Sequence, residues 1–398
     1  MSAQGGEEGR GGNGRNEAHD PALEFLSKAF RSYYFRHVES VEIPEDMRRR
    51  EFGYLNFEGA MVRHLTFPNE GEFKAMMVRE APRSAYCSVA YYDSPGLAME
   101  EKGYRKADLA FDIDSGDLNL PCTEKHDFYI CGSCGEPFRI KADKCPRCGS
   151  SDVAAVHFAC DRCLGAAKEE AVKLVDFLEL DFGVGPGQTA VYFSGNRGFH
   201  VSVVGSKYET VDQRGRAEMV EYVEGKGFGL KQVGLLPRRT AEELAPKLPL
   251  VGERGWRGRV ASVVYGVEGL GSQEALARAF VEQPDRIGSL VTKAIEEAGV
   301  KLDEGVTIDT HRVFRMGGTL HDKSGLLKKR YASLDGANPL DDAVAFGGEP
   351  VRVNVKYSPE FRLLGTSFGP YEKESLELPM YAAVYLAAKG LAVPGRGK

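Results

Sequence analysis

The chain has 398 residues, of which 42% are hydrophobic, and a formal net charge of -6 at pH 7. This length fits one large or two ordinary domains, and the acidic balance argues against a uniformly basic nucleic-acid binder. No stretch approaches about 18 consecutive apolar residues and no signal-peptide pattern opens the chain, so we expect a cytoplasmic protein without a membrane partner.

The first 20 residues, which include GGEEGRGGNGRN, carry almost no apolar side chains. Such a segment cannot offset the entropy lost on ordering. We therefore expect residues 1–20 to form a disordered tail and leave them out of the predicted fold.

An acidic pair lies on a strand predicted for residues 107–114. In ADLAFDID, apolar residues alternate with Asp112 and Asp114, which is the period-two pattern of a half-buried strand. The two carboxylates share one face, and they repel unless cations lie between them. Two magnesium or manganese ions would fit. Because Asp-x-Asp alone is a weak signal, a solvent-facing strand edge is the alternative.

Seven of the eight cysteines lie between Cys122 and Cys163. Six of them form the CxxC pairs Cys131/Cys134, Cys145/Cys148 and Cys160/Cys163. A CxxC turn lets two thiolates converge on one ion, so the spacing predicts tetrahedral zinc rather than disulfides in a chain without a secretory signal. Cys87, alone in SAYCSVAYY, is expected to be a core residue.

The cysteines predict two structural zinc ions. Glycine follows the second ligand of CGSCG and CPRCGS, and these similar pairs group together as Cys131, Cys134, Cys145 and Cys148. Cys160 and Cys163 then need two more ligands, for which Cys122 and His126 are the nearest upstream candidates. His157 in place of His126, and a single-zinc arrangement, remain open.

Two helical regions follow the cysteines. Apolar residues at helical spacing predict a helix over residues 164–182, ending before Gly183. Several helical patterns occur between about residues 207 and 299, one of them opening with the capping box from Thr240 to Glu243. We interpret this second stretch as a helical insertion.

Two polar clusters accompany the acidic pair. VYF and FHVSVV flank SGNRGFH like strands around a turn, and this places Ser194, Arg197 and His200 where they can grip a triphosphate. A purely structural histidine is the alternative for His200. Residues 302–326 then offer further metal ligands and phosphate-binding groups, namely Asp303, Asp309, Arg312, Arg315, His321 and Lys323.

With these clusters in this order, the sequence resembles the catalytic small subunit of the archaeal and eukaryotic DNA primase family. The resemblance spans nearly the whole chain. It is carried by SYYFRHVESVEIPEDMRRREFGYLNF, MVRHLTF, ADLAFDID, CLGAAKEEAVKLVDFLELDFG, VYFSGNRGFH, the Asp303 cluster and LPMYAAVYLAAKG. Several motifs at consistent spacing are far more specific than any one of them.

The resemblance implies roles residue by residue. The metal-binding carboxylates would be Asp112, Asp114 and Asp303, whereas Asp309 falls on a variable position. The nucleotide-binding residues would be Arg63, Ser194, Arg197, His200, Arg315 and His321. Asn196 departs from the family pattern, where an arginine stands in eukaryotic members. The family's zinc site would fall on Cys122, His126, Cys160 and Cys163, so that residues 127–159 are an insertion carrying the second set.

The family implies a mixed α/β fold, with a primase-polymerase catalytic core, a zinc-binding module and a helical insertion. We expect the core in three parts, 21–121, 164–206 and 300–398. The zinc-binding module with its inserted four-cysteine ribbon would occupy 122–163, and the helical insertion 207–299.

The implied activity is primer synthesis on single-stranded DNA by two-metal nucleotidyl transfer, using nucleoside triphosphates. A primase large subunit is the expected partner, and association with the nucleoid the expected location. One alternative is a stand-alone primase-like repair polymerase, which would generally lack this zinc region. Another is a zinc-ribbon nucleic-acid-binding protein whose catalytic core is inactive.

Overall fold

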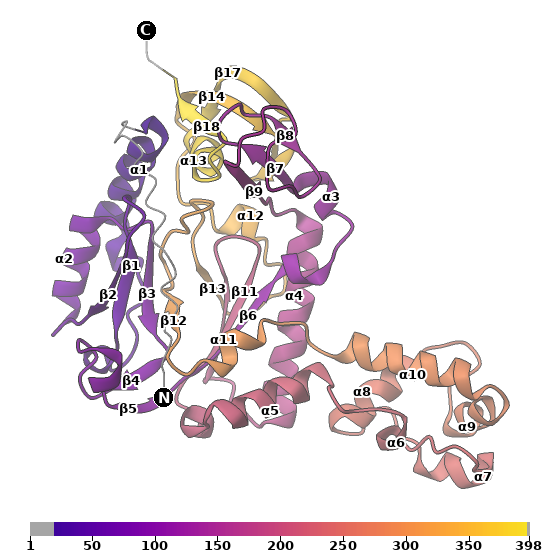
Figure 1. Cartoon of the computed structure of the whole chain (residues 1–398). Coiled ribbons are helices and arrows are strands. Elements are labelled where there is room, and N and C mark those ends of the chain that lie inside the picture. Colours follow the sequence, from indigo (N-terminus) through magenta and orange to yellow (C-terminus); the bar gives the residue numbers. More distant parts are fainter. Residues whose placement is uncertain (1–19, 396–398) are drawn as a thin grey trace, which may run out of the picture.

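The computed structural model describes residues 20–395 and combines helices with several small β-sheets (Figure 1). The expected mixed α/β class is thereby confirmed. Of the tail predicted for residues 1–20, only Asp20 is described, and its carboxylate caps the first helix by accepting a hydrogen bond from the backbone N–H of Ala22. The rest of that prediction lies outside the described residues.

A first sheet has the strand order β12-β3-β1-β2 and is antiparallel throughout. Its strands are β1 (Phe52–Leu55), β2 (Met61–Leu65), β3 (Ser84–Ser88) and β12 (Val313–Arg315). Two helices, α1 (Pro21–His37) and α2 (Glu70–Glu80), lie along this sheet (Figure 1). Phe30, Phe52 and Phe73 are among the residues that form their shared core, which also buries Cys87 as expected. A short hairpin follows, β4 (Ala90–Tyr92) and β5 (Tyr104–Ala107).

A second sheet has the order β13-β10-β11-β6 and is also antiparallel. Its strands are β6 (Leu109–Asp114), β10 (Thr189–Phe193), β11 (Gly198–Val203) and β13 (Lys329–Tyr331). The alternation predicted for ADLAFDID is present in β6, where Phe111 and Ile113 are fully buried and Asp112 and Asp114 only partly. The acids therefore lie on the face opposite the core.

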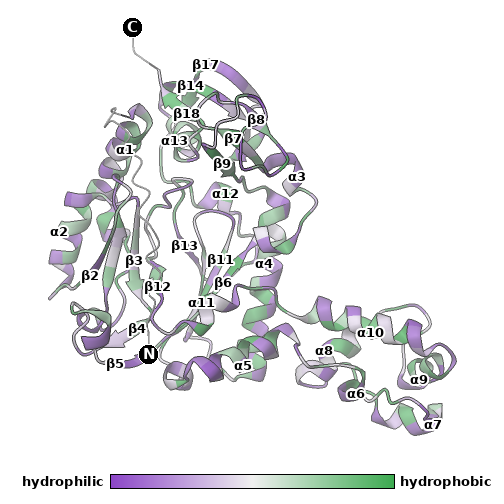
Figure 2. Cartoon of the chain, in the orientation of Figure 1, coloured by the Kyte–Doolittle hydropathy of each residue, from purple (hydrophilic) through white to green (hydrophobic). Residues whose placement is uncertain are grey.

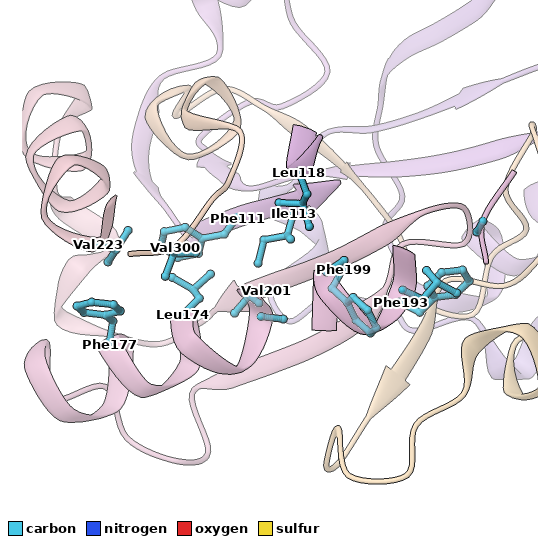
Figure 3. Packing of buried hydrophobic residues seen from close by; sticks show 14 of the residues in the cluster. Phe111, Ile113, Leu118, Leu174, Phe177, Phe193, Phe199, Val201, Val223 and Val300 are labelled. Carbon is cyan, nitrogen blue, oxygen red and sulfur yellow. The ribbon is translucent and has the colours of Figure 1, made fainter. Parts of the chain in front are cut away.

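Helix α4 (Asp161–Asp176) packs against the buried face of β6 and β11. Figure 3 shows Phe111, Ile113 and Val201 of the strands close to Leu174 of this helix. Each fully buried side chain of this size contributes about 1.5–3 kcal/mol relative to an exposed one. This layer of apolar side chains holds β6 and β11 in place, and the other face of these strands carries the polar residues.

The helix predicted for residues 164–182 differs from the observed one at both ends. It begins at Asp161, because the carbonyl of Cys160 already accepts a hydrogen bond from the Leu164 N–H. It ends at Asp176 and passes into one π-helical turn, Phe177–Asp181. The Arg259 guanidinium lies 3.7 Å from the centre of the Phe177 ring, so this turn is also where the helical insertion meets the core.

Residues between β6 and α4 form a small sheet of order β8-β7-β9. Its elements are α3 (Thr123–His126), β7 (Phe128–Cys131), β8 (Pro137–Phe138) and β9 (Val153–Val156). The rings of Phe128 and Tyr357 pack edge to face, with their centroids 4.9 Å apart. This small sheet therefore packs against the C-terminal sheet rather than against β6 and β11.

The C-terminal sheet has the order β17-β14-β18. The elements of this part are α12 (Pro339–Asp342), β14 (Pro350–Ser358), β15 (Phe361–Leu363), β16 (Thr366–Phe368), β17 (Tyr371–Pro379), α13 (Met380–Ala388) and β18 (Ala392–Pro394). The apolar helix α13 is largely buried.

The stretch 207–299 is helical, but its first helix belongs to the core. Helix α5 (Gln213–Glu224) packs against α11 (Glu304–Ile308), and its buried Arg216 donates hydrogen bonds to the carbonyls of Ala107 and Asp108. The helices that project as a lobe (Figure 1) are α6 (Leu230–Val233), α7 (Ala241–Leu244), α8 (Gly255–Val264), α9 (Gln273–Glu282) and α10 (Pro284–Ala298).

The helices of the lobe enclose apolar side chains that belong to the same hydrophobic cluster as those of the core. Hydrophobic and hydrophilic residues alternate around its helices (Figure 2), and Trp256, Leu276 and Val291 are buried between them. The predicted capping box at Thr240 and Glu243 is present at the start of α7. Among residues 20–395 we find no helix whose length and hydropathy would suit a membrane crossing.

Candidate functional site

Asp112 and Asp114 lie on the exposed side of β6, beside β11. Asp112 pairs with His200 across the two strands, and Asp114 pairs with Gly198. A Cβ atom at position 198 would lie 1.9 Å from the Ile113 carbonyl oxygen, so only glycine allows this close pairing. Burial, followed by the nearby charges of Asp114 and Asp303, raises the pKa of Asp112 to about 6. Arg197 pairs with Asp114, but the positive charges near Asp112 do not offset the rise in its pKa.

Asp303 comes from a distant part of the chain and joins this pair. Its backbone N–H donates to the Asp112 carbonyl at 2.9 Å, and its Oδ1 caps α11 by accepting from the Gly305 N–H at 2.9 Å. Asp309 lies at the other end of α11, where its Oδ1 accepts from the His311 N–H. The structure thus brings Asp303, and not Asp309, to Asp112.

The turn between β10 and β11 carries Ser194, Arg197 and His200 as the sequence suggested. The Ser194 hydroxyl accepts from the Gly198 N–H at 3.3 Å, which holds the turn. Arg197 Nη2 lies 3.0 Å from Asp114 Oδ1, and its buried Nε has no hydrogen-bond partner. This guanidinium faces the acid pair with donors to spare.

His200 lies where the two sheets meet. Its Nε2 is 3.5 Å from Asp112 Oδ1, and its ring stacks on Phe314 of β12 with centroids 4.2 Å apart. Burial lowers the pKa of His200 well below its usual value, and the charges of Lys328 and Arg315 lower it further. His200 is therefore neutral at physiological pH, and its buried Nδ1 has no partner.

Arg315 ends β12 of the first sheet, and His321 lies in the loop that follows it. Arg315 Nη1 donates to the Ser84 hydroxyl at 2.6 Å, while its buried Nε has no partner. A Cβ at Gly195, whose φ is +94°, would lie 2.9 Å from the Cβ of His321, so the turn and His321 are in close contact. Burial, and then the charge of Arg315, lowers the pKa of His321.

Arg63 is engaged elsewhere. Its Nε donates to Glu51 Oε1 at 2.8 Å, and Glu51 is also paired with the buried Lys102. Its Nη2 is buried without a partner, as are the Nε atoms of Arg197 and Arg315. Arg63 thus pairs with a structural carboxylate that lies outside the acid cluster and the turn.

The cysteines form the two groups expected from their spacing. Within each group the ligand atoms all lie within 4.8 Å of one another; the groups are Cys122, His126, Cys160 and Cys163, and Cys131, Cys134, Cys145 and Cys148. All eight cysteines of the chain are free thiols. Four sulfur and nitrogen atoms at this spacing suit tetrahedral zinc. His126 Nε2 lies 3.3 Å from Cys163 Sγ, whereas His157 instead bonds to Asp127.

The sequence comparisons agree with this geometry. The profile of the DNA primase small subunit family matches residues 159–332, which include the turn, Asp303 and Arg315. The DNA primase small subunit PriS of Cenarchaeum symbiosum is 37% identical over 379 residues, covering 94% of this chain and 99% of that protein. The corresponding subunit of Nitrosopumilus maritimus is 35% identical, with 93% and 98% covered, and that of Pyrobaculum calidifontis 33%, with 90% and 95% covered.

The chain belongs to the DNA primase small subunit family.

One buried and one half-buried lysine of this primase, Lys328 and Lys389, were not singled out by the sequence. Lys328 Nζ donates to the Arg315 carbonyl and lies 4.5 Å from the centre of the Phe314 ring. Burial, followed by the charge of Arg315, lowers its pKa to about 7. Of the positive charges near Asp112, Lys328 does the most to lower the pKa of this carboxyl.

The second of these lysines is Lys389, which directly follows α13. Its Nζ donates to the His157 carbonyl at 2.6 Å, and burial followed by the charge of Arg197 lowers its pKa to about 7. Lys328 falls in a run of basic residues and Lys389 directly follows an apolar helix, so the available signals were charge excess and a lone cation after apolar residues. Neither signal specifies which lysine is buried.

Proposed function

We propose that this primase makes primers at Asp112, Asp114 and Asp303 by two-metal-ion nucleotidyl transfer. The observation that carries the proposal is the convergence of these carboxylates, from separate segments, on a face that also holds Arg197 and His200. Carboxylate oxygens are the ligands that magnesium and manganese prefer, and the raised pKa of Asp112 indicates charge that a cation would neutralise. The donor set therefore fits two such ions.

The ions, when bound, would activate a hydroxyl and stabilise the departing phosphate oxygens. The primase's own residues bind and orient the nucleotide: Arg197 and Arg315 provide unpartnered donors for phosphate oxygens, and His200 and His321 provide neutral rings that can donate one hydrogen bond each. Ser194 holds the turn, and Arg63 Nη2 offers a further donor. The 3'-hydroxyl of a bound nucleotide would then attack the α-phosphate and release pyrophosphate.

The test is primer synthesis on unprimed single-stranded DNA, with the chain alone and with a primase large subunit, using ribonucleotides and deoxyribonucleotides separately. We expect new primers to appear. A chain that extends a supplied primer but never starts one would be a repair-type polymerase instead. A chain that fails to bind a nucleoside triphosphate in the presence of manganese would be a nucleic-acid-binding protein with an inactive core.

The proposed partners are a primase large subunit, single-stranded DNA and nucleoside triphosphates, and we place the enzyme with the nucleoid in the cytoplasm. The proposed parts of the chain remain the core segments 21–121, 164–206 and 300–398, the zinc module 122–163 and the insertion 207–299. The packing of α5 on α11 supports a later start for the projecting lobe, after Glu224.

We propose structural zinc in both Cys/His groups. The purified chain should therefore contain zinc in two sites, and Cys134→Ser should lower the zinc content by one ion per chain without unfolding the core, because its group lies in the ribbon away from β6 and β11. Elemental analysis and circular dichroism would measure both effects. Cys87→Ala, which changes a buried thiol outside both groups, is the control; one zinc per wild-type chain would contradict the assignment.

A further inference from the structure

Asp127 lies between α3 and β7 and accepts hydrogen bonds from two directions. Its Oδ1 receives His126 Nδ1 at 2.8 Å and the Phe158 N–H at 3.2 Å. Its Oδ2 receives His157 Nδ1 at 2.7 Å. Because His126 turns its other nitrogen, Nε2, toward Cys163, the carboxylate fixes the orientation of that ring in the first Cys/His group.

The same carboxylate also faces the turn between β10 and β11. Arg197 Nη1 lies 3.7 Å from Asp127 Oδ2, while Arg197 Nη2 lies 3.0 Å from Asp114 Oδ1. The Arg197 side chain is only 17% exposed. Gly116 leaves room for it, since a Cβ there would approach Nη2 to 2.5 Å. The guanidinium is thus held between a carboxylate of the acid pair and one from the zinc-binding module.

We propose that Asp127 is a positioning residue that couples the first Cys/His group to Arg197, so that the zinc-binding module sets the affinity of the site for the incoming triphosphate. The inference rests on the nucleotide-binding role proposed for Arg197. Within residues 20–395, no contact joins Asp127 to Asp112 or Asp114. We therefore expect a change at Asp127 to alter nucleotide binding rather than the chemical step.

The position of the Asp127 carboxylate behind Arg197 can be explained by the balance of charges around the guanidinium. An arginine that faces only Asp114 would be drawn onto that carboxylate, which the proposed ions need as a ligand. A second carboxylate behind Arg197 balances that attraction and keeps the guanidinium at the end of β11. Because Asp127 is itself fixed by His126, His157 and Phe158, it holds this position with little freedom.

The first test is Asp127→Asn in the full chain. The amide keeps an acceptor for His126 and Phe158 but removes the negative charge that faces Arg197. The Kd for a base-labelled ATP in the presence of manganese, measured by fluorescence anisotropy, should rise about tenfold. Turnover at saturating nucleotide should change little. Asp143→Asn, an exposed acid in the same module, is the matched control and should leave the Kd unchanged. An unchanged Kd in Asp127→Asn overturns the proposal.

The second test is a double-mutant cycle with Arg197→Gln. If Asp127 acts through Arg197, the change at Asp127 should have no further effect on the Kd once Arg197 is replaced. Effects that add in full would show a different route and overturn the proposal. A normal Kd in Arg197→Gln alone would instead overturn the nucleotide role of Arg197, and with it the route assigned to Asp127.

A third variant covers the case in which Asp127→Asn fails to fold. His157→Ala changes an exposed side chain outside both Cys/His groups and removes the hydrogen bond that orients Oδ2 of Asp127 beside Arg197. A raised Kd for the labelled ATP, with zinc content unchanged, supports the coupling. A Kd equal to that of the wild-type chain contradicts it.

Discussion

Replacing Asp112 and Asp114 together by asparagine should abolish primer synthesis, with turnover reduced by at least about 10³-fold. The reason is that asparagine keeps the shape of each side chain but removes the charges that attract the proposed ions. Because burial and neighbouring carboxylates already raise the pKa of Asp112, removing the charges relieves repulsion in the folded protein. We therefore expect folding and zinc content to be preserved while activity is lost.

Glu372→Gln/Glu374→Gln is the matched control for this double variant. These acids also lie two residues apart on a strand, but on exposed positions of β17 in the C-terminal sheet. The control should retain primer synthesis. Thermal denaturation and elemental analysis would establish that both double variants are folded and contain zinc. Continued synthesis by Asp112→Asn/Asp114→Asn would rule out the assigned catalytic site.

Asp303→Asn should also reduce turnover strongly, on the order of 10²-fold, whereas Asp309→Asn should change it little. Asp303 approaches Asp112, and only one of its carboxylate oxygens is used to cap α11. Asparagine caps helices as well as aspartate does, so Asp303→Asn should leave α11 intact. The difference in turnover between the two variants therefore measures the effect of the negative charge next to Asp112.

Manganese binding provides the independent measurement for this comparison. Titration calorimetry should show weaker binding of manganese to Asp303→Asn and wild-type binding to Asp309→Asn. Asp309 serves as an internal control because it caps the other end of the same short helix and its carboxylate also accepts from a backbone N–H. Equal losses in the two variants would mean that the choice of Asp303 as the third ligand is wrong.

Local patterns predicted the parts of the site that depend on local geometry. The alternation in ADLAFDID placed Asp112 and Asp114 on one face of a strand, and the CxxC spacing separated the cysteines into two groups. The SGNRGFH segment predicted a turn between two strands, and β10 and β11 are joined there. The alternation and the turn are set by residues within a few positions of one another, whereas each cysteine group joins ligands from two separate segments of the chain.

The features that could not be predicted depend on contacts between distant segments. The stacking of His200 on Phe314 requires the two sheets to meet, and no periodicity encodes that. The same holds for Asp127, because an acid beside a histidine in the sequence does not indicate a contact with Arg197. The early start of α4 was missed because the helical pattern was counted from apolar residues, although the chain already turns at Cys160.

The order of the segments along the chain constrains when the enzyme can become active during its own synthesis. β6 and β11 leave the ribosome before the lobe, but Asp303 and the edge strand β13, which pairs with β10, emerge after it. The lobe consists of local helical contacts that form quickly, whereas pairing β10 with β13 closes a loop of more than a hundred residues. A chain released before Tyr331 therefore carries the acid pair and the turn on a sheet that still exposes an unpaired strand.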